Sequence, residues 1–110
     1  MSYQTKTING HTIISLSGEI DLQTSPEARE QLLELLKDGR HLLVDMAQVD
    51  YIDSSGIASL VEALQYAKSN GLSFALIEIS QATRQVIKLA RLDKVFPLYD
   101  NAEQGMAAVE

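Results

Sequence analysis

The sequence of 110 residues lacks cysteine and tryptophan, and it holds only two phenylalanines and four tyrosines. The absence of cysteine excludes disulfides, thiolate chemistry and cysteine-ligated metals, and it makes a reducing cytosol the natural compartment. Platforms that stack the bases of single-stranded nucleic acid need aromatic side chains, so the low aromatic content argues against that function.

Long apolar runs and basic residues are also scarce. The amino-terminal stretch MSYQTKTING has no apolar signal core, and the uninterrupted apolar runs are only a few residues long, far short of a membrane span. Nine Lys and Arg residues stand against fifteen Asp and Glu residues, and the net charge of −6 opposes the attraction that nucleic acid and anionic membranes need. We therefore expect a cytoplasmic protein with a protein partner, no nucleic acid binding and no direct membrane insertion.

Hydrophobic residues make up 45% of the chain, which suits one compact domain that buries roughly two thirds of its unfolded surface. The sequence shows no internal repeat, linker or low-complexity segment. A single domain is therefore predicted over residues 1–110.

Turn and capping signals place the first elements. Asn9-Gly10 tolerates the positive φ angles of a tight hairpin turn, and the segments YQTKTI and HTIISLSG on either side have the composition of strands. In TSPEAREQLLELLKDG, Thr24 and Glu27 have the spacing of a capping box and Gly39 ends the helix. The chain therefore opens with two antiparallel strands followed by a helix.

The rest of the sequence alternates between strands and helices. The apolar run from Leu42 to Val44 predicts a strand covered on both faces, and residues 47–53 are predicted to form an irregular connection. Apolar residues at helical spacing from Ile57 onwards predict a second helix, which Asn70-Gly71 ends. The remaining patterns predict a buried strand in SFALIEI, a helix capped by Ser80, an edge strand in KVFPLY and a terminal helix in NAEQGMAAVE.

This order of elements predicts an α/β fold. We expect a mixed β-sheet of four to five strands that opens with an antiparallel hairpin, with about four α-helices packed on it.

The segment YIDSSGI places Asp53, Ser54, Ser55 and Gly56 at the start of the second helix. One interpretation is that Asp53, Ser54 or Ser55 simply caps the helix, because free backbone N–H groups there need acceptors. The excess of capping residues favours a second interpretation, as does the glycine, which costs up to ~1 kcal/mol relative to alanine in a helix. In that interpretation Gly56 leaves the backbone bare, so that a docking protein reaches the neighbouring hydroxyl.

Phosphorylation of Ser54 suits this position. A phosphate adds about −1.5 to −2 charges next to a helix N-terminus, where negative charge is favourable, so we expect the fold to survive. A partner that binds the neutral surface would instead meet buried negative charge beside Asp53. Ser54 is therefore predicted to act as a binary switch of binding.

No catalytic or cofactor motif is present. The six glycines form neither a Walker loop nor a dinucleotide-binding loop, and the kinase signature set is missing, so ATP has to come with a partner. Residues 52–56 read Ile-Asp-Ser-Ser-Gly, which departs from the Gly-x-Ser-x-Gly elbow of a hydrolase, and neither His11 nor His41 has a second histidine at ligand spacing. We expect a binding protein without cofactor or metal, not an enzyme.

Two segments resemble the STAS domain family, and within it the bacterial anti-sigma factor antagonists. GEID, residues 18–21, resembles the Gly-Glu-Leu-Asp of the family, and YIDSSGI, residues 51–57, resembles its Asp-Ser-Ser/Thr-Gly-Leu. Their spacing, the helix after each and the segment ARLDKVFPLYD extend the resemblance to nearly the whole chain.

The resemblance implies partner switching. Unphosphorylated relatives of this kind bind a serine kinase that is also an anti-sigma factor, and so release a sigma factor. The kinase carries the ATP and ends the binding by phosphorylation, and a protein phosphatase restores it. The implied phosphoacceptor is Ser54, with Ser55 as the lesser candidate, and the implied partner-binding residues include Asp53, Glu19 and Asp21.

Two alternatives remain open at this stage. Glu19 and Asp21 can equally serve strand-end solvation and turn formation. STAS domains also act as cytoplasmic accessory subunits of membrane complexes that transport lipids or anions, which is the alternative function for the whole chain.

The third predicted helix carries a basic stripe of Arg84, Lys88 and Arg91. Its apolar face is predicted to comprise Ala82, Val86 and Leu89. The stripe is either a solvated helix face or a surface for an acidic partner or lipid headgroups.

Overall fold

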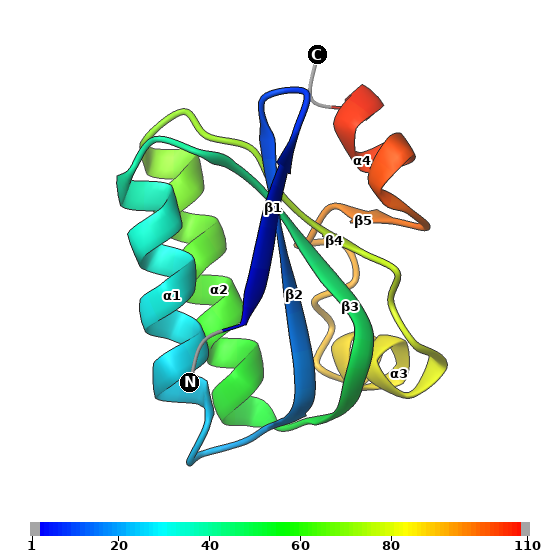
Figure 1. Ribbon diagram of the computed structural model, residues 1–110. Helices are drawn as coiled ribbons and strands as arrows, with labels where there is room; N and C mark the ends of the chain where they lie inside the picture. The colour runs from blue at the N-terminus through cyan, green and yellow to red at the C-terminus, as the bar shows by residue number, and fades with distance from the viewer. Residues whose placement is uncertain (1–2, 109–110) are drawn as a thin grey trace.

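One five-stranded sheet organises the computed structural model, which describes residues 3–108 (Figure 1). The strands lie in the order β1-β2-β3-β4-β5; β1 and β2 are antiparallel, and the other neighbours are parallel. The elements are β1 (Gln4–Ile8), β2 (His11–Ile20), α1 (Ser25–Lys37), β3 (His41–Ile52), α2 (Ser54–Ser69), β4 (Phe74–Ile77), α3 (Gln81–Leu89), β5 (Leu98–Tyr99) and α4 (Ala102–Ala108). The predicted α/β fold with a mixed sheet and four helices is confirmed.

The hairpin between β1 and β2 closes as predicted from its two turn residues. Asn9 has φ 51° and Gly10 has φ 80°, both in the left-handed region. Two successive positive φ angles match the right-handed twist of the flanking strands, so Ile8 and His11 pair directly.

Helices cover both faces of the sheet. Helices α1 and α2 lie side by side on one face, and α4 lies on the other (Figure 1). Along β3, Leu42 and Val44 join the large core under α1 and α2, while Leu43 joins a smaller core with Ile13 and Ile77 under α4. The continuous apolar run in β3 therefore reflects burial on both faces, as the sequence indicated.

Strand β3 continues through the segment predicted to be irregular. Between the pairs His11–His41 and Ile20–Ile52, β2 advances nine positions and β3 eleven, so β3 carries two extra residues, at the two register shifts. These bulges keep Val49 and Ile52 buried and leave Asp50 and Tyr51 exposed, which breaks the alternation that a sequence pattern can detect. The prediction of an irregular connection over residues 47–53 was therefore wrong up to Ile52.

Helix α3 begins as predicted but faces the core differently. The Ser80 hydroxyl accepts a hydrogen bond from the Thr83 N–H at 3.3 Å, which confirms the N-cap. The buried residues of the helix are Thr83 and Ile87, whereas Leu89 is 84% exposed. Of the predicted apolar face, Val86 packs against the core, but Ala82 and Leu89 are exposed, because the helix is rotated to insert Ile87 beside β3.

None of the helices within residues 3–108 combines the length and the apolar character that spanning a bilayer requires.

Candidate functional site

Asp53 forms the junction between β3 and α2. Its Oδ1 accepts hydrogen bonds from the backbone N–H groups of Ser55 and Gly56, at 2.9 and 3.2 Å, and from the Ser55 hydroxyl at 2.6 Å. Its own N–H donates to the carbonyl of Ile20 at 3.2 Å, which ties the junction to the end of β2. One carboxylate thus satisfies two of the free N–H groups of the helix and identifies Asp53 as the cap.

The two neighbouring hydroxyls differ in their surroundings. Ser54 is the first residue of α2 and is exposed, and its hydroxyl has no hydrogen-bond partner among residues 3–108. Ser55 is half-buried, and its hydroxyl is held by Asp53. Ser54 therefore presents an unengaged nucleophilic oxygen to solvent, whereas Ser55 would have to break the capping arrangement to react.

Gly56 is buried, and the packing of its own domain accounts for the absence of a side chain. A Cβ at this position would lie 2.6 Å from Ile52 Cγ1, 2.8 Å from the Ile20 carbonyl oxygen and 2.9 Å from Ile20 Cγ2. Real Cβ atoms essentially never come this close to other heavy atoms. The glycine lets the first turn of α2 press against the ends of β2 and β3, and a docking protein is not needed to explain it.

Asp21 builds the turn between β2 and α1. Its Oδ1 accepts from the N–H groups of Gln23 and Thr24, at 3.0 and 3.1 Å. The Thr24 hydroxyl donates to the carbonyl of Glu19 at 2.7 Å and accepts from the Asp21 N–H at 2.9 Å. Because the Thr24 side chain makes no capping bond to α1, the predicted capping box is wrong, and the same hydroxyl fixes the turn instead.

Both turns lie at one edge of the sheet. Ile20 and Ile52 are paired, so the turn after β2 and the junction before α2 stand next to each other, at the lower end of the molecule in Figure 1. Glu19, which is exposed, pairs in register with Tyr51. The predicted site residues Glu19, Asp21, Asp53, Ser54 and Ser55 are therefore brought together on one surface.

Two exposed apolar residues at this edge were not predicted. Leu22 is 76% exposed and Tyr51 is 51% exposed. The available signals were an apolar residue inside a polar turn, for Leu22, and a tyrosine beside Asp50 where alternation fails, for Tyr51. Tyrosine is enriched among the residues that dominate protein interfaces, so Tyr51 in particular is a candidate contact residue.

The surface beside the junction is acidic. A hollow of about 420 Å³ is lined by Tyr3, Ser17, Gly18, Glu19, Asp21, Gln23, Thr24 and Glu27. Burial raises the pKa of the Tyr3 phenol, and the nearby carboxylates of Glu27 and Asp21 raise it further. Three carboxylates around one hollow create a negative potential that a phosphate on Ser54 would strengthen.

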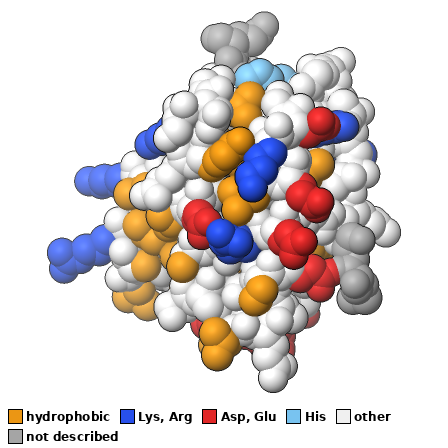
Figure 2. Space-filling view, turned by 90° about the vertical axis from the view of Figure 1, so that its left-hand side faces the viewer, with side chains coloured by type: hydrophobic (Ala, Val, Ile, Leu, Met, Phe, Trp, Pro, Cys, Tyr) orange, Lys and Arg blue, Asp and Glu red, His pale blue; other side chains and the backbone are white. Residues whose placement is uncertain are grey.

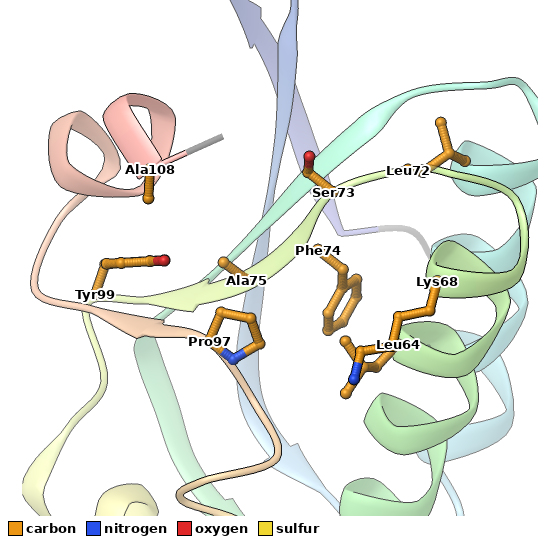
Figure 3. Close-up of a pocket in the computed structure, with 9 residues that line it drawn as sticks. All are labelled: Leu64, Lys68, Leu72, Ser73, Phe74, Ala75, Pro97, Tyr99 and Ala108. Carbon is orange, nitrogen blue, oxygen red and sulfur yellow. The ribbon is translucent and has the colours of Figure 1, made fainter. Parts of the chain in front are cut away.

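A second hollow lies away from this site. It has a volume of about 270 Å³ and is lined by Leu64, Lys68, Leu72, Ser73, Phe74, Ala75, Pro97, Tyr99 and Ala108 (Figure 3). Leu64 and Lys68 belong to the last turns of α2, a helix of 16 residues and about 24 Å that begins at Ser54. The hollow therefore lies at the other end of α2 and has no residue in common with the junction.

The capping carboxylate should make stability depend on pH. The hydrogen bond from the Ser55 hydroxyl lowers the pKa of Asp53, helped by the Gly56 and Ser55 N–H groups and opposed by burial. With the folded pKa below the unfolded value of about 3.9, the contribution is complete above that value and is lost as pH falls through the folded pKa. In urea unfolding, Asp53→Asn should be less stable than wild type at pH 7, and the difference should shrink at pH 3; a constant difference would contradict this role.

Comparison with known proteins identifies the fold family. The family model described as STAS domain matches residues 2–105. The chain belongs to the STAS domain family. An anti-sigma F factor antagonist of Paenibacillus polymyxa is 25% identical to this STAS domain over 103 residues, which cover 92% of this chain and 88% of that protein.

Solved structures agree with this STAS fold. A Thermotoga maritima protein described as an anti-sigma factor antagonist superposes with a TM-score of 0.90 at 22% identity, over 97% of this chain and 93% of that one. The antagonist SpoIIAA has been solved unphosphorylated, with a TM-score of 0.81 at 16% identity, over 98% of this chain and 96% of that one. Its phosphorylated form from Bacillus gives 0.73 at 17% identity, over 99% of this chain and 100% of that one. At these identities the likeness shows the fold.

Proposed function

We propose that this STAS domain is an anti-sigma factor antagonist controlled by phosphorylation at Ser54. The observation that carries the proposal is the exposed Ser54 hydroxyl, which has no hydrogen-bond partner among residues 3–108 and stands directly after the capping Asp53. The name of the Paenibacillus polymyxa relative supports the antagonist role.

The proposed partner is a serine kinase that is also an anti-sigma factor. The unphosphorylated chain binds this kinase and frees the sigma factor. The kinase then uses its own ATP to phosphorylate Ser54, which ends the binding, and a protein phosphatase removes the phosphate. In this cycle the chain is a binding protein that undergoes chemistry but catalyses none.

The position of Ser54 favours a switch that leaves the fold intact. A phosphate on the first residue of α2 meets the positive end of the helix dipole, which stabilises negative charge. The Asp53 carboxylate beside it is half-buried and already accepts three hydrogen bonds from the first turn, and these donors offset part of its negative charge. The added charge therefore acts at the surface toward a partner.

The proposed docking surface is the edge that surrounds Ser54. Asp53 and Ser55 shape the loop, and the carboxylate of Glu19 and the turn built by Asp21 flank it. Leu22 and Tyr51, whose side chains are largely exposed, supply apolar contact area. Gly56 lies beneath and lets α2 approach the sheet.

The site of phosphorylation tests the proposal. The chain should be incubated with ATP and the serine kinase recovered with it from native lysate, and the modified peptide located by mass spectrometry. We expect one phosphate, on Ser54, and none on the Ser54→Ala variant, while Ser55→Ala is still labelled. If Ser54→Ala were labelled and Ser55→Ala were not, the phosphoacceptor would be Ser55, and the proposal would be wrong.

A further inference from the structure

Charge is distributed unevenly along the chain. Residues 81–95 hold four of the nine Lys and Arg residues but only one of the fifteen Asp and Glu residues, a local charge of +3 in a chain of net charge −6. The remainder therefore carries −9. Figure 2 shows Lys and Arg side chains standing out at one edge of the face that it displays, where no Asp or Glu side chain is seen, whereas elsewhere on this face both kinds of charge are mixed.

The basic segment also carries exposed apolar side chains. Leu89 is 84% exposed because Thr83 and Ile87 form the buried face of α3, and Val95, in the turn after the helix, is 41% exposed. We name the surface of Lys88, Leu89, Arg91, Lys94 and Val95 the α3 patch.

The cations of the α3 patch are available for a ligand. Lys88, Arg91 and Lys94 are exposed, and none of them has an ion pair within residues 3–108. Arg84, in contrast, lies 3.9 Å from Asp100, so we leave it out of the patch. Asp93 is the acidic residue within the segment and is half-buried.

We propose that the α3 patch binds the surface of membranes that contain anionic lipid. Leu89 would enter the boundary between headgroups and acyl chains, and the three cations would contact lipid phosphates. Each Lys or Arg near such a surface favours binding by a factor of about five, and burial of a leucine adds a factor of about ten or more. Together these predict weak, reversible association.

The size and shape of the patch favour a lipid surface over a protein partner. A stable protein interface takes about 800 Å² from each side, with shape complementarity. Helix α3 has nine residues and is about 14 Å long, and its most exposed feature is a protruding leucine. A fluid lipid surface needs neither a large area nor a matching pocket.

The acidic remainder of the chain does not cancel this attraction. The molecule measures 30 × 26 × 24 Å along its principal axes, and the Debye length at physiological salt is about 8 Å. Carboxylates on the far side are therefore screened from a surface that touches α3. The net charge of the whole chain argued against anionic partners, but it does not measure the charge that one face presents.

Co-sedimentation with vesicles tests the proposal. Wild type should bind vesicles made of equal parts of phosphatidylcholine and phosphatidylglycerol in 50 mM salt. Its affinity for vesicles of phosphatidylcholine alone should be at least tenfold lower. The double variant Lys88→Glu/Arg91→Glu should lose more than tenfold in affinity for the anionic vesicles. The matched control Lys6→Glu/Lys37→Glu makes the same change in net charge outside α3 and should bind like wild type.

A second variant separates lipid binding from attraction to any acidic polymer. Leu89→Ser removes an exposed side chain, so the fold should be unchanged by circular dichroism while vesicle binding falls about tenfold. Absence of wild-type binding to the anionic vesicles, or equal losses in the two double variants, would overturn the proposal. The proposal would also be overturned if Leu89→Ser bound as well as wild type, both to polyglutamate beads and to the vesicles. That result would indicate a soluble acidic partner.

Discussion

Replacing Ser54 by glutamate is expected to weaken binding of the kinase partner by a factor on the order of a hundred to a thousand, while Ser54→Ala keeps the wild-type affinity. When the partner covers the site, the added carboxylate stands beside that of Asp53. One such like-charge pair at 4 Å costs on the order of 4 kcal/mol at an effective dielectric constant of 20. Each 1.4 kcal/mol corresponds to a factor of ten in affinity. Both variants should fold, because Ser54 is exposed and the helix N-terminus tolerates negative charge.

Ser69→Glu is the matched control for this experiment. Ser69 is also exposed and is the last residue of the same helix, so the variant adds the same charge far from the junction. Calorimetric titration should give wild-type affinity for Ser69→Glu. Equal affinities for Ser54→Glu and Ser69→Glu would show that charge at Ser54 has no special effect on the partner.

Gly56→Ala is expected to lower the free energy of unfolding by about 2–3 kcal/mol. Its Cβ would meet the carbonyl oxygen of Ile20 at 2.8 Å as well as the side chain of Ile52 at 2.6 Å. Backbone cannot move aside as a flexible side-chain end can, so the start of α2 has to shift away from the sheet. Urea unfolding followed by circular dichroism measures the loss.

Gly105→Ala provides the comparison. Gly105 is also buried in a helix, but its added Cβ would meet side-chain ends, Leu43 Cδ2 at 3.0 Å and Ile77 Cγ2 at 3.2 Å. Those groups can give way, and alanine gains up to ~1 kcal/mol over glycine in a helix. The loss should therefore stay within about 1 kcal/mol of zero, and losses of equal size at the two glycines would mean that close packing does not explain Gly56.

The parts of the fold that depend on a few neighbouring residues could be predicted from the sequence. The hairpin follows from the left-handed conformation that Asn9-Gly10 accepts, and the start of α3 follows from the hydroxyl of Ser80. In both cases the residues that decide the geometry are adjacent in the chain. A few neighbouring residues are therefore enough to predict these features.

The parts that depend on distant residues could not be predicted. The second half of β3 has exposed residues at Asp50 and Tyr51, and only pairing with β2 shows that these positions belong to a bulged strand. Thr24 has capping-box spacing, but its hydroxyl finds the carbonyl of Glu19 instead. The rotation of α3 is set by the space beside β3, which receives Ile87 and leaves Leu89 in solvent.

The candidate site shows the same division. Asp53 and Ser54 stand out in the sequence because capping chemistry is local, and the structure gives each a distinct environment. The close contacts of Gly56 come from Ile52 and from Ile20, and Ile20 lies far away in the sequence at the end of β2, so a bare backbone for docking was the natural but unnecessary explanation. Leu22 and Tyr51 become visible as contact residues only when their exposure is known.

The central claim is that negative charge on the Ser54 oxygen removes the partner and leaves the domain folded. Its most direct measurement is a titration of the kinase into the chain before and after stoichiometric phosphorylation, with the unfolding midpoint of both forms recorded. We predict at least a hundredfold loss of affinity with nearly the same midpoint. Undiminished affinity of the phosphorylated form, or a loss of affinity explained by unfolding, would contradict the account.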